Sequence, residues 1–326
     1  MRILIIKPSS LGDVVHALPT VNLVRRRFPS ATITWLINDE LASLLKKDCP
    51  IIDGVIAFPR REFGKPWKLA RALKFLRRLR AERFDLVIDL QGLLRSGIMT
   101  WATRAPRRIG LSDAREGSRF FYNEIVQVPR AHAVERYLLA ARHLGAEAGP
   151  VEFPLPSAAP DITYVDELLP KARPLIAVNP SARWETKLWG DDRFAALIKK
   201  LPRERVVLTG SAADAARLEK LAQGCVNLAG RTDLAQLAEV CRRCAVVITN
   251  DSGPMHLAAA VGTPVIAIFG PTDPALTGPY GKGHIVLRSG IPCSPCMSAD
   301  CHHTPRMECM QLVTVEQVLA AMKAFL

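Results

Sequence analysis

The residues with the clearest chemistry lie in the stretch Asn-Asp-Ser-Gly-Pro-Met-His at 250–256. The β-rich apolar run 245–249 before it predicts a buried parallel strand, and the residues after it predict a short helix. Backbone N–H groups of Ser252 and Gly253 at such a helix start would bind a phosphate, because the helix dipole favours an anion there. His256, one turn further, could reach the same anion or a sugar hydroxyl. An ordinary helix N-cap fits these residues equally well, so both interpretations stay open.

A second junction between a strand and a helix lies at the amino terminus. The apolar run 2–6 predicts a buried strand, and the small residues after it predict a loop that leads into a helix near Asp13. A carboxylate in this position has two possible roles. It is either a helix cap that the dipole keeps ionised or a general base that faces a ligand.

Three motifs together resemble the lipopolysaccharide heptosyltransferases of glycosyltransferase family 9, and most of all heptosyltransferase I. They are Ile-Ile-Lys-Pro-Ser-Ser-Leu-Gly-Asp-Val-Val-His at 5–16, the 250–256 stretch, and Phe-Gly-Pro-Thr-Asp-Pro at 269–274. These proteins are inverting glycosyltransferases that use ADP-heptose. The resemblance implies that Asp13 is the general base, which removes the proton of the acceptor hydroxyl. It also implies that Lys187 neutralises the departing diphosphate.

The resemblance places the sugar donor mainly in the second half of the chain. Lys187 lies between Trp184 and Trp189, which makes a merely solvated surface lysine less expected. Asp251 either orients the heptose hydroxyls or caps the helix. The predicted donor-binding residues are Ser9, Gly12, Ser181, Thr209, Gly210, Asp251, Ser252, Gly253 and His256. Because these groups supply positive potential, we expect no cofactor beyond ADP-heptose, which is the donor substrate, and no required metal.

Arginines recur after strands and in loops of the first half of the chain. Their guanidinium groups suit carboxylate and phosphate, to which they donate two parallel hydrogen bonds. Any one of these arginines alone is better explained as a surface residue than as a ligand contact. Their recurrence as a set favours binding of an anionic ligand. The resemblance implies that they meet the acidic sugars of a lipid A-Kdo acceptor. The predicted acceptor-binding residues are Arg60, Arg61, Arg95, Arg115, His132 and Arg136.

Strand-like and helical segments alternate through both halves, which predicts an α/β protein with parallel sheets. By resemblance the fold is GT-B, with two Rossmann-like domains that face one another across a cleft. A segment with four prolines, 149–160, predicts an extended linker. We therefore expect an acceptor-binding domain at 1–156 and an ADP-sugar-binding domain at 157–312. A C-terminal helix at 313–326 is expected to pack back toward the first domain.

The formal charge of +13 is compatible with nucleic acid, an anionic membrane surface or an acidic substrate as partner. A solvated surface is the remaining alternative. Aromatic residues make up only 6%, and no basic stretch interleaves with them, so no nucleic acid partner is expected. The basic amphipathic segment 67–83 fits either a solvated helix face or the anionic inner-membrane surface. Since no apolar run has the length of a membrane span, we expect a cytoplasmic, peripheral and monomeric protein.

The cysteines of the C-terminal region are the one motif outside the resemblance to heptosyltransferase I. A cytoplasmic protein keeps its thiols reduced, so the eight cysteines of the chain are not expected to form disulfides. Four of them have residue types that suit a metal, but their longer gaps fit no standard zinc pattern. Reduced thiols are favoured over a metal site at Cys293, Cys296, Cys301 and Cys309.

The predicted function is transfer of a heptose, with inversion, from ADP-L-glycero-D-manno-heptose to the Kdo/inner-core acceptor of lipopolysaccharide. One alternative is a related transferase with another sugar or acceptor, such as the second core heptose or a protein. The other is a non-catalytic nucleotide-binding protein, which the fold alone would permit.

Overall fold

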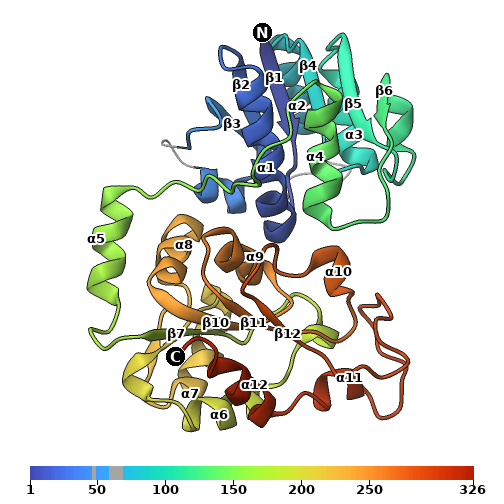
Figure 1. Cartoon of the computed structure of the whole chain (residues 1–326). Helices are drawn as coiled ribbons and strands as arrows, with labels where there is room; N and C mark the ends of the chain where they lie inside the picture. Colours follow the sequence, from blue (N-terminus) through green and yellow to red (C-terminus); the bar gives the residue numbers. More distant parts are fainter. Residues whose placement is uncertain (46–48, 59–68) are drawn as a thin grey trace. The chain divides into compact units, whose positions relative to one another are not determined.

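The computed structural model describes residues 1–45, 49–58 and 69–326, which form two compact units, Met1–Pro156 and Ser157–Leu326. Each unit contains a six-stranded sheet with helices around it (Figure 1). The strands pair in parallel, and most of their side chains are buried on both faces, as expected where helices cover a parallel sheet. The predicted α/β class with two Rossmann-like parallel-sheet domains is confirmed.

The first unit has the strand order β3-β2-β1-β4-β5-β6. Its strands are β1 Arg2–Ile6, β2 Thr32–Asn38, β3 Gly54–Phe58, β4 Leu86–Asp89, β5 Arg107–Leu111 and β6 Glu124–Val126. Its helices are α1 Leu11–Arg27, α2 Leu69–Ala81, α3 Leu94–Ala102 and α4 Ala133–His143, with 3-10 turns η1 Asp39–Leu45 and η4 Ser118–Phe121. The strand order reverses between β1 and β4, which makes their carboxyl ends the expected ligand edge.

The second unit repeats this topology with the order β12-β11-β10-β7-β8-β9. Its strands are β7 Leu175–Asn179, β8 Val206–Leu208, β9 Val226–Asn227, β10 Cys244–Asn250, β11 Val265–Ile268 and β12 Ile285–Leu287. Its α-helices are α5 Ala159–Leu168, α6 Asp191–Lys199, α7 Ala215–Ala222, α8 Leu234–Arg242, α9 Gly253–Ala260, α10 Pro274–Thr277, α11 Glu308–Gln311 and α12 Val315–Met322. Three 3-10 turns, η5 Glu185–Lys187, η6 Arg203–Arg205 and η7 Ala212–Asp214, complete it. Here the order reverses between β7 and β10.

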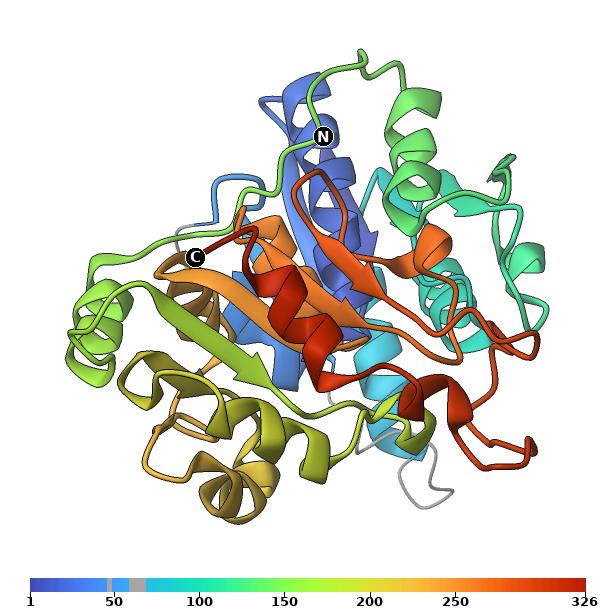
Figure 2. The same cartoon turned by 60° about the horizontal axis from the view of Figure 1, so that its bottom comes forward.

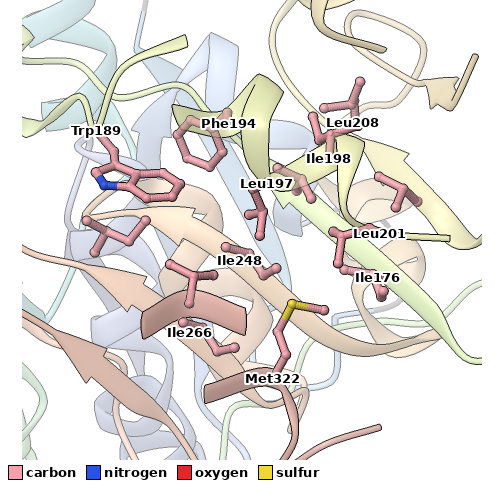
Figure 3. Close-up of a cluster of buried hydrophobic side chains, with 14 of the residues drawn as sticks. Ile176, Trp189, Phe194, Leu197, Ile198, Leu201, Leu208, Ile248, Ile266 and Met322 are labelled. Atoms are coloured by element: carbon pink, nitrogen blue, oxygen red, sulfur yellow. The ribbon is translucent and has the colours of Figure 1, made fainter. Parts of the chain in front are cut away.

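The C-terminal helix α12 packs on the sheet of its own unit. Figure 3 shows Met322 beside Ile176, Ile248 and Ile266 in the core of the second unit. Figure 2 shows α12, in red, across the strands of that sheet, and it contacts β11, β12 and α6. The buried apolar side chains of this helix therefore belong to the core of its own unit. That residues 313–326 also pack toward the first domain stays a prediction.

Among the described residues, no helix combines the length and the apolar character needed to cross a membrane.

Candidate active site

Asp13 lies in the first turn of α1, next to the carboxyl end of β1. Its Oδ2 atom accepts hydrogen bonds from the backbone N–H and the hydroxyl of Ser10 at 3.0 and 2.8 Å. Its Oδ1 atom accepts a hydrogen bond from the Tyr137 hydroxyl at 3.2 Å. These donors fix the direction of the carboxylate, yet its side chain stays 39% exposed. A capped helix start and an accessible carboxylate therefore coexist in one residue.

Lys7 lies beneath this carboxylate and is almost fully buried, with 3% of its side chain exposed. Its ammonium donates to the Leu90 carbonyl at 3.0 Å and to the Tyr137 hydroxyl at 2.9 Å, and it lies 3.7 Å from Asp13 Oδ1. Burial alone would lower the pKa of the Lys7 ammonium. The interactions with Asp13 and Tyr137 together have a larger effect, so this pKa is raised. The lysine is therefore a permanent cation beneath Asp13.

The Lys7 ammonium favours the ionised form of Asp13. Burial favours the neutral carboxyl, but the Lys7 charge and the two Ser10 donors outweigh it and hold the pKa of Asp13 well below its usual range. The carboxylate is thus ionised throughout the pH range in which proteins are ordinarily studied. It can accept a proton only as that proton leaves its donor during a reaction.

Asp89, which ends β4 beside Ile6 of β1, organises the loop that follows it. The carboxylate accepts hydrogen bonds from the backbone N–H groups of Gln91 and Gly92 at 2.8 and 3.1 Å, and from the Tyr122 hydroxyl at 2.7 Å. Burial raises the pKa of Asp89. Because it is fully buried, Asp89 supports the site rather than facing a ligand.

A pocket of about 180 Å³ opens in the first unit at this loop. One predicted acceptor residue, Arg95, lines it, with the guanidinium 5.9 Å from the centre of the Phe58 ring. Ser9, which was predicted to bind the donor, lines the same pocket, and its N–H donates to Gln91 Oε1 at 3.2 Å. The full lining consists of Pro8, Ser9, Asn38, Phe58, Gln91, Leu93, Arg95, Ser96, Met99 and Glu116.

The other predicted acceptor residues are spread along the first unit. Arg136 pairs with Asp113 at 2.6 Å, and His132 caps α4 with its Nδ1, 3.3 Å from the N–H of Val134. Arg115 is exposed and follows the Asp89 loop, where its backbone N–H donates to the Gly92 carbonyl at 2.8 Å. Two further candidates, Arg60 and Arg61, lie outside the described residues. Gly12, a predicted donor residue, is buried within α1.

The second unit contains a different lysine–aspartate pair at the carboxyl end of β10. Lys187 Nζ lies 2.7 Å from Asp251 Oδ2, and the Thr272 hydroxyl donates to the same oxygen at 2.5 Å. Asp251 is only 4% exposed, whereas Lys187 is 18% exposed and lies 4.7 Å from the centre of the Trp184 ring. The aspartate is therefore the buried member, and the ammonium is the accessible one.

Asn250 connects the two segments that carry this pair. Its Oδ1 accepts from the backbone N–H of Trp189 at 3.1 Å, and its Nδ2 donates to the Pro180 carbonyl at 3.0 Å. These bonds tie the segment 180–189, which carries Lys187, to the end of β10. Such a bridge explains how residues more than sixty positions apart meet.

The start of α9 lies next to the same pair. Ser252 is the N-cap of this helix, and its hydroxyl lies 3.1 Å from the Thr249 hydroxyl. Pro254 has no N–H, so the backbone donors at the helix start come from Ser252 and Gly253. His256, one turn along, is buried. The arrangement is that of a helix N-terminus suited to a phosphate.

The remaining predicted donor residues lie at the ends of β7 and β8. The Ser181 hydroxyl accepts from Arg217 at 2.7 Å, and the Thr209 hydroxyl accepts from Asn179 at 3.1 Å. A Cβ on Gly210 would lie 2.7 Å from the side chain of Leu218. Close packing thus accounts for this glycine without a ligand.

The four C-terminal cysteines all carry free thiols. Cys301 accepts a hydrogen bond from the N–H of Met307 at 3.2 Å, and burial raises the pKa of the Cys309 thiol. Within residues 1–45, 49–58 and 69–326, no group of three or more His, Cys, Asp or Glu side chains is arranged to hold a metal ion.

Lys7 and Tyr137 belong to the Asp13 site but were not predicted from the sequence to do so. Lys7 had a usable signal, because a lysine directly after a buried strand must lie at the ligand edge of the sheet. Tyr137 had none, since it reaches Asp13 from α4, more than a hundred positions away in the chain.

Comparison with known proteins assigns the family. The model of glycosyltransferase family 9 (heptosyltransferase) matches residues 72–306. This chain belongs to glycosyltransferase family 9. The family and the enzyme class predicted from the sequence are confirmed.

Individual members of family 9 are similar along nearly the whole chain. Lipopolysaccharide heptosyltransferase 1 of Pseudomonas aeruginosa is 33% identical over 97% of this chain and 92% of its own length. Lipopolysaccharide heptosyltransferase 2 of Escherichia coli is 30% identical, covering 88% of each chain.

Solved structures of family 9 members confirm the GT-B fold. The structure of E. coli ADP-heptose lipopolysaccharide heptosyltransferase II has a TM-score of 0.81 and 27% identity, over 100% of this chain and 98% of its own. E. coli heptosyltransferase WaaC with ADP has a TM-score of 0.80 and 27% identity, over 100% of both chains.

Proposed function

We propose that this family 9 glycosyltransferase moves heptose from ADP-L-glycero-D-manno-heptose to the Kdo/inner-core acceptor of lipopolysaccharide, with inversion. The observation that carries the proposal is the Asp13 carboxylate, which is oriented, ionised and accessible in the unit whose pocket is lined by Arg95. The names of the relatives support the sugar and the acceptor. In this assignment the first unit binds the acceptor, and the second unit binds the donor.

Asp13 acts as the general base in this proposal. It accepts the proton of the acceptor hydroxyl while that oxygen forms a bond to the anomeric carbon of heptose and the bond from that carbon to the diphosphate breaks. A single displacement of this kind inverts the anomeric centre and releases ADP. Because Lys7 lowers the pKa of Asp13, proton transfer occurs late, once the attacking oxygen has become acidic.

The second unit stabilises the leaving group in this proposal. Lys187 supplies a positive charge, and the backbone N–H groups of Ser252 and Gly253 receive a phosphate at the start of α9. His256 reaches the same diphosphate, and Asp251 holds the lysine in place. No metal is needed for this charge balance. Ser181, Thr209 and Gly210 complete the donor site.

The pocket of the first unit is assigned to the acceptor. Arg95 is the arginine among its lining residues, and Ser9 also lines it. Arg115, His132 and Arg136, together with Arg60 and Arg61, provide further positive charge for the carboxylates and phosphates of the lipid A-Kdo acceptor.

We assign the protein to the cytoplasmic face of the inner membrane, as a peripheral protein. The acceptor is lipid-linked, and the chain carries a formal charge of +13 that suits an anionic surface. Basic residues on α2 are exposed, at Arg71, Lys74, Arg77, Arg78 and Arg80. A monomer suffices for the proposed reaction.

A second candidate is the addition of the second core heptose. It is supported by the similarity to lipopolysaccharide heptosyltransferase 2 of E. coli and to the solved heptosyltransferase II structure. The two candidates differ only in whether the acceptor already carries one heptose.

Single-turnover transfer from ADP-heptose to delipidated acceptors tests the proposal. One acceptor ends in Kdo and the other in heptose-Kdo, and wild type is compared with Asp13→Asn. We expect wild type to prefer the Kdo acceptor and the variant to lose about a hundredfold or more in rate, with ADP-heptose binding retained. Preference for heptose-Kdo would establish the second candidate. If Asp13→Asn were as fast as wild type, Asp13 would be a helix cap only.

A further inference from the structure

Helix α3 exposes large apolar side chains along one face. Leu94, Ile98 and Trp101 are all exposed, with Trp101 at 45%. Their spacing of four and three residues places them in one row on the helix, whereas the opposite side, with Ser96 and Met99, is buried. We call Leu94, Ile98 and Trp101 the α3 apolar face.

Two elements that contact α3 also expose large apolar side chains. The 3-10 turn η4 contacts α3 and carries Phe120, which is 91% exposed. Helix α2 also contacts α3 and exposes Leu69 and Leu73 (both helices are labelled in Figure 1). A soluble surface rarely gathers so many large apolar groups unless it binds something.

Cationic side chains surround the apolar ones. The Arg104 guanidinium lies 4.2 Å from the centre of the Trp101 ring. The exposed cations on these three elements and at their ends include Arg71, Lys74, Arg77, Arg78, Arg80, Arg83, Arg95, Arg104 and Arg119. A tryptophan that stacks with arginine beside aliphatic residues suits the boundary between lipid headgroups and acyl chains.

The α3 apolar face also begins at the pocket assigned to the acceptor. Leu93 and Arg95 line that pocket, and exposed Leu94 lies between them in the chain. From Leu94 to Trp101 the helix rises about 10 Å, so the apolar row extends by that length from the pocket. An acceptor whose sugar enters the pocket would therefore have its lipid portion next to this face.

We propose that the α3 apolar face, with Phe120, inserts into the surface of an anionic lipid bilayer, while the surrounding arginines and lysines contact the headgroup phosphates. A protein partner would also cover apolar side chains, but the excess of cations favours a uniformly anionic surface. The choice of a membrane as partner rests on the proposed function, in which the acceptor is lipid-linked. Docking itself does not require catalysis and can be measured separately.

Vesicle binding tests this surface. Full-length protein is mixed with vesicles of phosphatidylglycerol and phosphatidylcholine, or of phosphatidylcholine alone, and the bound fraction is measured by flotation. We expect wild type to bind the anionic vesicles more tightly, and high salt to weaken that binding. Trp101→Ser should weaken it by about tenfold, since the interfacial affinity scales with the apolar area buried. Arg104→Gln should have a smaller effect and reduce the salt dependence.

Leu312→Ser is the matched control, because Leu312 of the second unit is a similarly exposed apolar residue. It should bind vesicles as wild type does. Equal binding by Trp101→Ser and wild type, or an equal loss in Leu312→Ser, would overturn the inference. Binding of the wild type to neutral and anionic vesicles with the same affinity would do so as well, because the cations would then have no role. Binding to neither would overturn the inference and favour a protein partner for the apolar residues.

Rates of heptose transfer distinguish the docking role of the α3 apolar face from the proposed catalytic function. Trp101→Ser should transfer heptose to a delipidated acceptor at the wild-type rate but should slow on the same acceptor embedded in anionic vesicles. If wild type transferred no heptose to any acceptor while Trp101→Ser still lost vesicle binding, the proposed function would fail and the docking surface would stand. An equal slowing on both acceptors would mean that Trp101 serves the reaction itself, and would overturn the docking role.

Discussion

Each unit places one lysine–aspartate pair at the carboxyl edge of its sheet, but the two pairs are built in opposite senses. In the first unit the lysine is buried and the aspartate is accessible, at 3% and 39% exposed for Lys7 and Asp13. In the second unit the aspartate is buried and the lysine is more accessible, at 4% and 18% for Asp251 and Lys187. The same two residue types thus present a negative group to ligands in one unit and a positive group in the other.

The buried member of each pair sets the state of the accessible one. Lys7 keeps Asp13 ionised, and Tyr137 helps to direct the accessible carboxylate. Asp251 also accepts from Thr272 and pairs with Lys187, so the more accessible ammonium is held at the residue that precedes the N-cap of α9. An inverting transfer needs one base and one cation for the leaving group, and the two arrangements supply one each.

The largest effect is expected from removing the accessible cation of the second unit. Lys187→Met should lower kcat/KM by about a hundredfold to a thousandfold, because the developing charge on the diphosphate loses its closest partner. The loss should be the same at every pH, since the variant leaves Asp13 unchanged. Steady-state kinetics from pH 5 to 9, with Lys187→Arg as the control that keeps the charge, would measure it. A Lys187→Met enzyme with wild-type kcat/KM would remove Lys187 from the mechanism.

Removing the buried cation of the first unit should instead create a pH dependence. In wild type the pKa of Asp13 lies far below the assay range, so the base is ionised throughout. In Lys7→Met the burial of Asp13 remains while its main counter-charge is lost, so the pKa of Asp13 must rise. The activity should therefore fall as pH decreases through the new pKa, with a loss of less than about tenfold near neutral pH.

The pH profile of kcat/KM for Lys7→Met beside that of wild type measures this effect. ADP-heptose affinity serves as the control and should not change, because Lys7 belongs to the unit assigned to the acceptor. Two profiles of the same shape would show that Lys7 does not control the ionisation of Asp13.

The contrast also shows how far the sequence could predict this site. The accessible members, Asp13 and Lys187, follow from local motifs at the ends of strands and from the family resemblance, and the sheets follow from the alternation of apolar runs. Their partners depend on the tertiary fold. Tyr137 reaches Asp13 from α4, and Thr272 reaches Asp251 from beyond β11, at distances in the chain that no periodicity encodes.

Side-chain competition limits prediction for other residues. The Ser181 hydroxyl is bound to Arg217, and Arg136 is paired with Asp113, and neither of these partners could be predicted from the motif around the residue. The packing of the C-terminal helix was hard to predict for a related reason. Its apolar spacing predicts that one face is buried, but nothing in the spacing says which sheet buries it.

The smallest effects are expected from the neutral donors that complete each pair, and Tyr137→Phe and Thr272→Val are a matched test. Tyr137→Phe removes one hydrogen bond from the accessible carboxylate and one from the buried Lys7 ammonium, so kcat should fall a few-fold and unfolding should also become easier by about 1–3 kcal/mol. Thr272→Val removes one from a buried carboxylate, so unfolding should become easier by about 1–3 kcal/mol while kcat stays close to that of wild type. Denaturant titration and kcat measured on both variants give the comparison directly. If Thr272→Val lost more activity than Tyr137→Phe, Asp251 would contact the reacting sugar, and the division of roles between the two pairs would be wrong.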